Sequence, residues 1–142
     1  MIDLEEFPAH LKSLSPTDWN KLFELLPEME KADQFGEMVM CEKDAEGFTQ
    51  MPYWNPAKIT QQFVEVVYEL NIMPVFDWIK WQEGKKIMEN NATDLDQLDV
   101  VTLCKLLTVI IRADRLNDGF LIGNMEDGTI QKIIRALWKQ KI

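Results

Sequence analysis

The stretch VVTLCKLLTVIIRADR, residues 100–115, decides the fold. Its few polar positions before the final Ala-Asp-Arg recur every three or four residues, so that on a helix they lie on one narrow side. These positions are Thr102, Lys105, Thr108 and Arg112. An α-helix that is apolar around most of its circumference is typical of the middle of a helical bundle. We therefore expect this segment to be the central helix of an all-α domain.

Four further segments carry the apolar spacing of amphipathic helices. Helix start signals precede three of them, at Ser15-Pro16, at Asn55-Pro56 and at Asp77. The third of these helices is expected to carry Trp78, Trp81 and Met88. The fourth segment, residues 130–138, has the most regular apolar stripe and follows a turn glycine, Gly128. The pattern predicts a compact bundle of five to six helices around the central one.

The helical period is lost between Phe35 and Trp54. Glycine and proline separate two short stretches there, residues 37–41 and 48–51. A small β-hairpin with its turn at residues 43–46 fits this region, and so does a packed irregular loop, because apolar and polar residues alternate poorly.

The 142 residues are expected to form a single domain, residues 1–142, because no linker or internal repeat divides them. Within it we distinguish an acidic N-terminal portion, residues 1–50, from a core, residues 51–142. The acidic portion contains 12 acids and four lysines and accounts for most of the net charge of −9. A nucleic-acid-binding protein needs a basic stripe to neutralise phosphates. We therefore predict no nucleic-acid partner.

Three features favour a cytoplasmic location. The opening residues MIDLEEFPAH carry acids where a secretory signal carries lysines and apolar residues. The cysteines, Cys41 and Cys104, lie in unrelated contexts, so we expect no disulfide. The longest apolar stretch, residues 100–111, is too short to cross a bilayer and contains Lys105, which argues against a membrane partner.

No sequence motif indicates catalysis, a metal site or a cofactor. His10 is the only histidine, which excludes two-histidine chemistry. The acids of residues 94–99 resemble a calcium loop, but its sixth position is Asp99 instead of glycine and its twelfth is Lys105 instead of glutamate. We interpret these acids as caps of the central helix. Phosphate-binding and dinucleotide-binding loops are missing too, so we predict no catalytic residue, no metal and no cofactor.

Two of the three arginines of the chain lie in Arg112-Ala113-Asp114-Arg115. Projected on a helix, both arginines fall near the polar side, whereas Asp114 falls on the apolar face. A buried carboxylate needs hydrogen-bond donors. One interpretation is therefore structural: Asp114 caps the backbone N–H groups of a second helix, near residues 117–120.

The other interpretation of this cluster is a binding pocket. Arg112 and Arg115 would hold the carboxylate or phosphate of an anionic metabolite through paired hydrogen bonds. Helical spacing places the two tryptophans of the preceding segment side by side, where they would form an aromatic wall or pack in the core. The remaining residues of this predicted pocket are Asp77, Trp78, Trp81 and Asp118.

The same motifs carry a family resemblance. The blocks Pro74-Val-Phe-Asp-Trp78 and Arg112-Ala-Asp-Arg115, followed by Gly119 and an Ile/Leu-rich terminal helix, resemble a family of small uncharacterised bacterial proteins, a domain of unknown function numbered 6508. The resemblance covers residues 51–142 and departs from the family pattern at Leu116, where phenylalanine is usual. It implies a bacterial, cytoplasmic, helical domain and supplies no catalytic residues.

These patterns favour a non-enzymatic bacterial interaction or regulatory module, in which a protein partner contacts the aromatic and arginine-containing region. The alternative is a small enzyme or ligand-binding protein that takes an anionic metabolite in an arginine/aromatic pocket. The two differ in a structural observable. A pocket is concave and lined by those side chains, whereas an interaction module presents a broad apolar patch.

Overall fold

The computed structural model describes residues 2–40, 43, 45–47, 51–90 and 93–141. Their elements in chain order are α1 (Phe7–Ser13), α2 (Pro16–Phe23), α3 (Leu25–Lys31), β1 (Gly36–Val39), β2 (Tyr53–Pro56), α4 (Lys58–Leu70), α5 (Gln82–Glu89), a 3₁₀ turn (Leu95–Gln97), α6 (Val100–Asp114), α7 (Phe120–Glu126) and α8 (Thr129–Lys141). The helical class with one small hairpin is confirmed. Within the described ranges, no helix has both the length and the apolar composition needed to span a bilayer.

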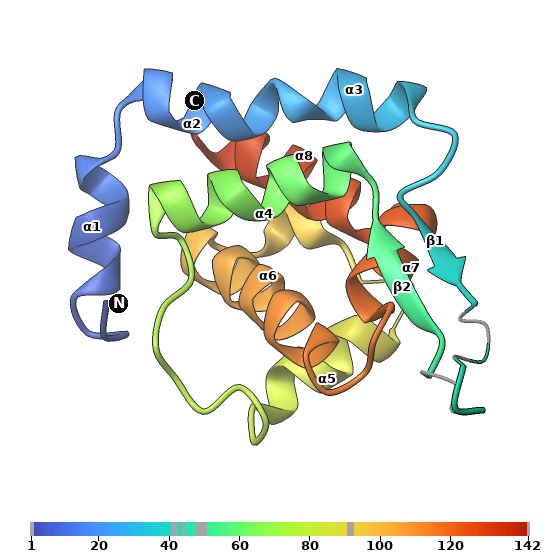
Figure 1. The fold of residues 1–142 in the computed structure, drawn as a ribbon. Helices are drawn as coiled ribbons and strands as arrows, with labels where there is room; N and C mark the ends of the chain where they lie inside the picture. The colour runs from blue at the N-terminus through green and yellow to red at the C-terminus, as the bar shows by residue number, and fades with distance from the viewer. Residues whose placement is uncertain (1, 41–42, 44, 48–50, 91–92, 142) are drawn as a thin grey trace.

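Helix α6 lies at the centre of the structure, as the sequence predicts. Most of its apolar side chains are buried, and Leu103, Leu107 and Ile110 are fully buried. Asp99 begins the helix, because its Oδ1 accepts a hydrogen bond from the backbone N–H of Thr102 at 2.7 Å. Figure 1 shows α4 above α6 and α5 below it, and α7 and α8 pack directly against α6.

The acidic N-terminal portion supplies part of the core. Ser15 and Asp18 exchange backbone-to-side-chain hydrogen bonds, which form the reciprocal cap at the start of α2. The backbone hydrogen bond from Ser15 is also the main cause that lowers the pKa of Asp18. Trp19, on the inner face of α2, is only 1% exposed, and Leu22 is fully buried. Helices α2 and α3 therefore cover α4 and α8, with their acids mostly on the outer side.

Two of the predicted helix starts are wrong. Pro56 ends β2 instead of beginning a helix, because the N–H of Ala57 still donates to the Phe35 carbonyl at 2.9 Å. Helix α4 begins only at Lys58. Asp77 does not cap α5 either: it accepts a hydrogen bond from the N–H of Lys80 in a local turn, and α5 begins at Gln82.

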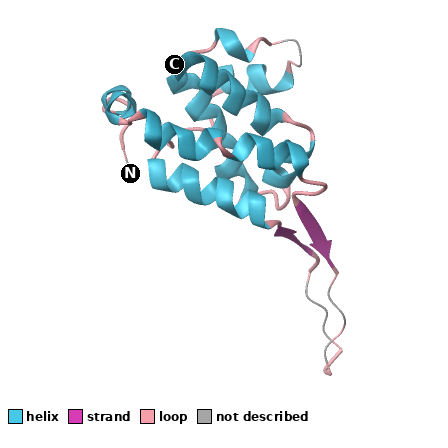
Figure 2. Cartoon of the chain, turned by 90° about the horizontal axis from the view of Figure 1, so that it is seen from above, coloured by secondary structure: helices cyan, strands magenta, loops and turns pink. Residues whose placement is uncertain are grey.

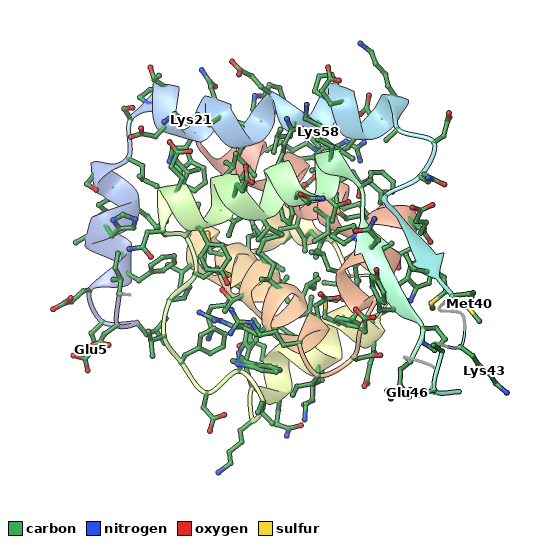
Figure 3. The ribbon with its side chains drawn as sticks, viewed as in Figure 1. Glu5, Lys21, Met40, Lys43, Glu46 and Lys58 are labelled. Carbon is green, nitrogen blue, oxygen red and sulfur yellow. The ribbon has the colours of Figure 1, made fainter. Side chains whose placement is uncertain are left out.

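The region without helical period contains an antiparallel hairpin. Strand β1 pairs with β2 in a register that runs from Gly36 opposite Pro56 to Val39 opposite Tyr53. The second strand thus lies after the predicted stretch 48–51, of which residues 48–50 fall outside the described residues. Figure 2 shows the hairpin extending away from the helices, and Figure 3 places Met40, Lys43 and Glu46 towards its tip.

His10 and Cys104 both have structural roles. His10 Nε2 lies 2.9 Å from the carbonyl oxygen of Leu70 and so ties α1 to the end of α4. The Cys104 thiol is free and fully buried in α6, and this burial raises its pKa. Cys41, the other half of the disulfide prediction, lies outside the described residues.

Candidate functional site

Asp114 joins the central helix to α7. It is the last residue of α6, and its Oδ1 accepts a hydrogen bond from the backbone N–H of Leu121 at 3.0 Å. Leu121 is the second residue of α7, whose first N–H groups have no partner within the helix. The carboxylate therefore acts as an N-cap supplied from another helix, one residue beyond the range expected from the sequence.

We expect Asp114→Ala to lower the free energy of unfolding by about 1–2 kcal/mol, the usual cost of losing a helix cap. Asp114→Asn keeps an oxygen that can accept the Leu121 N–H and should cost less than half as much. Urea unfolding of the two variants measures the difference. Equal losses would show that the charge of Asp114, and not its capping hydrogen bond, stabilises the fold.

The structure does not bring the two arginines into a shared pocket. Arg115 Nη2 donates to the hydroxyl of Tyr68 on α4 at 3.1 Å, on the surface. Arg112 is partly buried, and neither arginine lines the two cavities described below. Asp77 is exposed in the turn before α5, and it does not line either cavity. The predicted pocket of six residues is thus divided among separate places.

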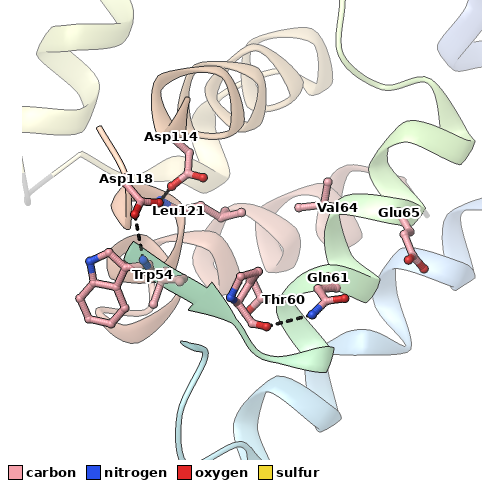
Figure 4. A pocket seen from close by; sticks show the side chains of 10 residues that line it. Trp54, Thr60, Gln61, Val64, Glu65, Asp114, Asp118 and Leu121 are labelled. Carbon is pink, nitrogen blue, oxygen red and sulfur yellow. Dashed lines mark hydrogen bonds between the residues drawn. The ribbon is translucent and has the colours of Figure 1, made fainter. Parts of the chain in front are cut away.

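Asp118 lines a cavity of about 340 Å³ between β2, α4 and the α6–α7 turn. Its Oδ2 accepts a hydrogen bond from the backbone N–H of Trp54 at 2.8 Å, which anchors the hairpin to the turn (Figure 4). Gly119, next in the chain, has a φ of +90°. A Cβ atom there would lie within 3.0 Å of the Trp54 indole, so only glycine lets the indole cover the turn. We name this space the acidic cavity, and its lining residues are Trp54, Pro56, Thr60, Gln61, Val64, Glu65, Asp114, Asp118, Leu121 and Ile122.

Trp78 and Trp81 line a second, larger space of about 510 Å³, bounded by α5, α6 and α7. We name it the aromatic groove. Its other lining residues are Ile79, Gly84, Lys85, Met88, Glu89, Val109, Phe120 and Asn124. The two tryptophans therefore do lie at one surface, although Trp81 only precedes α5 instead of lying within it.

The ring of Trp81 is held from several sides. The Lys105 ammonium of α6 lies 4.2 Å from its centroid, and the Phe76 ring meets it edge-on at 5.6 Å. On a third side the indole covers Gly84, where a Cβ atom would lie within 3.0 Å of the ring. The aromatic groove thus has a rigid wall.

Several lining residues carry no signal in the sequence. Gln61 and Glu65 look like ordinary exposed positions of α4, and Val109 and Phe120 look like core residues. The two glycines beneath the tryptophans were detectable in principle. Gly84 lies inside a short amphipathic helix, where glycine is unfavourable, and Gly119 marks a turn after the central helix.

The acids of residues 94–99, which resemble a calcium loop in sequence, form hydrogen bonds and an ion pair within the protein. Asp94 accepts from the N–H of Asp96, Asp99 caps α6, and Asp96 pairs with Lys139 of α8 at 2.6 Å. In the part of the chain that the structure describes, no group of three or more His, Cys, Asp or Glu side chains is arranged to hold a metal ion.

Comparison with known families identifies a match over most of the chain. Residues 14–141 match DUF6508, a family of unknown function. The chain belongs to this family. The DUF6508 match begins at residue 14, so that it includes most of the acidic portion that the motif resemblance left out. No curated protein and no solved structure matches the chain significantly.

Proposed function

We propose that this DUF6508 chain is a non-enzymatic interaction module that binds an apolar segment of a partner protein in the aromatic groove. The observation that carries the proposal is the groove itself. Trp78, Trp81 and Phe120 line about 510 Å³ of open space, a size typical of binding sites. Monomeric proteins rarely leave such aromatic surfaces uncovered unless something binds them.

The rim of the groove supports a protein partner. Ile79 is 56% exposed beside the two tryptophans and extends the apolar surface beyond the concave part. Lys85 and Glu89 line the groove with opposite charges. The charge at its rim is therefore balanced, unlike the strongly acidic N-terminal portion. Aromatic anchors surrounded by a mixed polar rim are typical of protein interfaces.

A rigid wall lowers the cost of binding. Trp81 is held by Lys105 and Phe76 in the unbound protein, so its rotamer does not have to be selected when a partner arrives. The motif resemblance to small bacterial proteins supports a bacterial, cytoplasmic setting for this module. The anionic-metabolite alternative lacks such support, because the arginines lie outside both cavities.

Peptide display against the immobilised protein tests the proposal. We expect selected peptides to share large apolar side chains and to lose at least about tenfold in affinity, or 1.4 kcal/mol, with Trp78→Ala and with Ile79→Glu. Trp138→Ala is the matched control, because Trp138 is a half-exposed tryptophan on α8 away from the groove. Fluorescence anisotropy with labelled peptides gives the affinities. Peptides that bind the Ile79→Glu variant as tightly as the unchanged protein would contradict the assignment of the groove.

A further inference from the structure

The acidic cavity lies on another side of α7 from the aromatic groove. Leu121 and Ile122 of α7 face the acidic cavity, whereas Phe120 and Asn124 line the groove. Figure 4 shows Asp114 and Asp118 close together at one side of the cavity, with Thr60, Gln61 and Val64 of α4 across from them. The cavity thus joins four elements of the fold, β2, α4, α6 and α7, and its shape does not depend on a single loop.

The lining of this cavity has an apolar part, a charged part and two neutral polar residues, Thr60 and Gln61. Its apolar part comes from Val64, Leu121 and Ile122 together with Trp54 and Pro56. Its charged part consists of three carboxylates, Glu65, Asp114 and Asp118, and among the described residues no lysine or arginine lines it. The cavity therefore combines an apolar surface with negative charge only.

None of these carboxylates forms an ion pair with a described residue. The ion pairs among the described residues join Lys21 to Glu69, Arg135 to Glu30 and Lys139 to Asp96, all away from the cavity. Asp114 and Asp118 each use one oxygen for a backbone N–H group. An ionised carboxylate has about four acceptor sites, so both retain capacity for another donor.

Concave surfaces lined by charges of one sign focus the electrostatic field and concentrate counter-ions. Here the field excludes anions, and the apolar lining gives no benefit to a hydrated inorganic cation. A molecule that satisfies both parts carries a positive nitrogen with N–H donors at one end and an apolar body at the other.

We propose that the acidic cavity binds a small organic cation, an ammonium group joined to a compact aromatic or branched aliphatic body. The ammonium contacts Asp114 and Asp118, and the apolar body lies against Val64, Leu121 and Ile122. A volume of about 340 Å³ suits a ligand of this size. This site is independent of the proposed interaction groove, and neither proposal needs the other.

Titration with three probes of the same shape tests this inference. The probes are 2-phenylethylammonium, the neutral 2-phenylethanol and the anionic 3-phenylpropionate. Binding is followed by NMR through the indole N–H of Trp54 and the amide of Leu121. We expect the ammonium probe to bind at least about tenfold more tightly than the alcohol, and the carboxylate probe to cause no shift. Raising the salt concentration should weaken the binding of the ammonium probe, because salt screens the attraction between charges.

Charge-removing variants locate the site. In the double variant Asp114→Asn/Asp118→Asn each side chain keeps an oxygen for its backbone N–H, so that the fold is retained and a melting curve can verify this. We expect the ammonium probe to bind at least about tenfold more weakly to this variant. Asp77→Asn is the matched control, since Asp77 also accepts a backbone hydrogen bond but lies outside the cavity; it should leave the affinity unchanged.

Three results would overturn the inference. One is equal affinity for the ammonium and alcohol probes, which would mean that the cavity recognises only apolar surface. The second is an ammonium affinity that the double variant leaves unchanged. The third is a wild-type spectrum that shows no shift at Trp54 and Leu121 even at about 10 mM probe, a concentration well above the millimolar limit of weak specific binding.

Discussion

Gly119→Ala should lower the free energy of unfolding by about 3 kcal/mol, more than most single substitutions outside a core. Two physical causes add up. The backbone of Gly119 has a φ of +90°, a conformation that L-residues with a Cβ atom rarely adopt. The new methyl group would also overlap the Trp54 indole, which must then leave the turn. Displacing the indole loosens the anchor between the hairpin and α7.

Gly128→Ala is the control that separates these two causes. Gly128 has a similar φ of +85°, but no atom lies within 4 Å of its hypothetical Cβ. This variant carries the backbone strain alone and should cost about 1 kcal/mol. Urea unfolding followed by circular dichroism measures both. If the two variants lose the same stability, the contact between Trp54 and Gly119 does not contribute, and the acidic cavity lacks the rigid indole described above.

Gly84→Ala should also destabilise the protein, by about 2 kcal/mol, although the usual rule for a helix predicts the opposite sign. Gly84 lies inside α5, where alanine is the better helix former. Its position is buried beneath the Trp81 ring, and a Cβ atom would lie within 3.0 Å of that ring. The indole must therefore turn away from Lys105 and Phe76, which costs more than the gain in helix propensity.

Gly123→Ala supplies the comparison for Gly84. Gly123 is also helical, in α7, but no atom approaches its hypothetical Cβ within 4 Å. The Gly123→Ala variant should have a free energy of unfolding about 0.5–1 kcal/mol higher, the ordinary gain from glycine to alanine in a helix. Thermal melts measure the stability of the two variants, and tryptophan fluorescence reports whether Trp81 changes its position. A stabilised Gly84→Ala variant would mean that Trp81 moves freely and that the aromatic groove has no fixed wall.

The two glycines therefore have the same role on different sides of the molecule. Each lets a tryptophan lie directly on a backbone segment, and each tryptophan then forms the wall of a cavity. This shared arrangement explains why the five tryptophans of the chain are not simply core residues. Trp19 fills the core, whereas Trp54 and Trp81 shape the surfaces where the two proposed ligands bind.

The outline of the fold followed from the sequence alone. The apolar circumference of residues 100–115 predicts a central helix because burying such a surface is the only way to remove it from water. The cap at Ser15 and the stripe of residues 130–138 are likewise local signals, since a helix repeats every 3.6 residues whatever surrounds it. For the same reason the sequence places the carboxylate of Asp114 on the apolar face of the central helix.

The tertiary structure decided which residues face one another. Pro56 and Asp77 carry valid helix start signals. Pro56 nevertheless ends a strand, since the N–H of Ala57 donates to the Phe35 carbonyl, and the side chain of Asp77 accepts the N–H of Lys80 in a local turn. Helical spacing places Arg112 and Arg115 near the same face of the central helix. It does not predict that Arg115 contacts Tyr68, because that contact depends on where α4 crosses. Both cavities are lined by elements that are far apart in the chain. The spacing of apolar residues within one element does not indicate which distant element packs beside it. Periodicity determines which face of an element is buried, whereas the packing of several elements against α6 determines what each face meets.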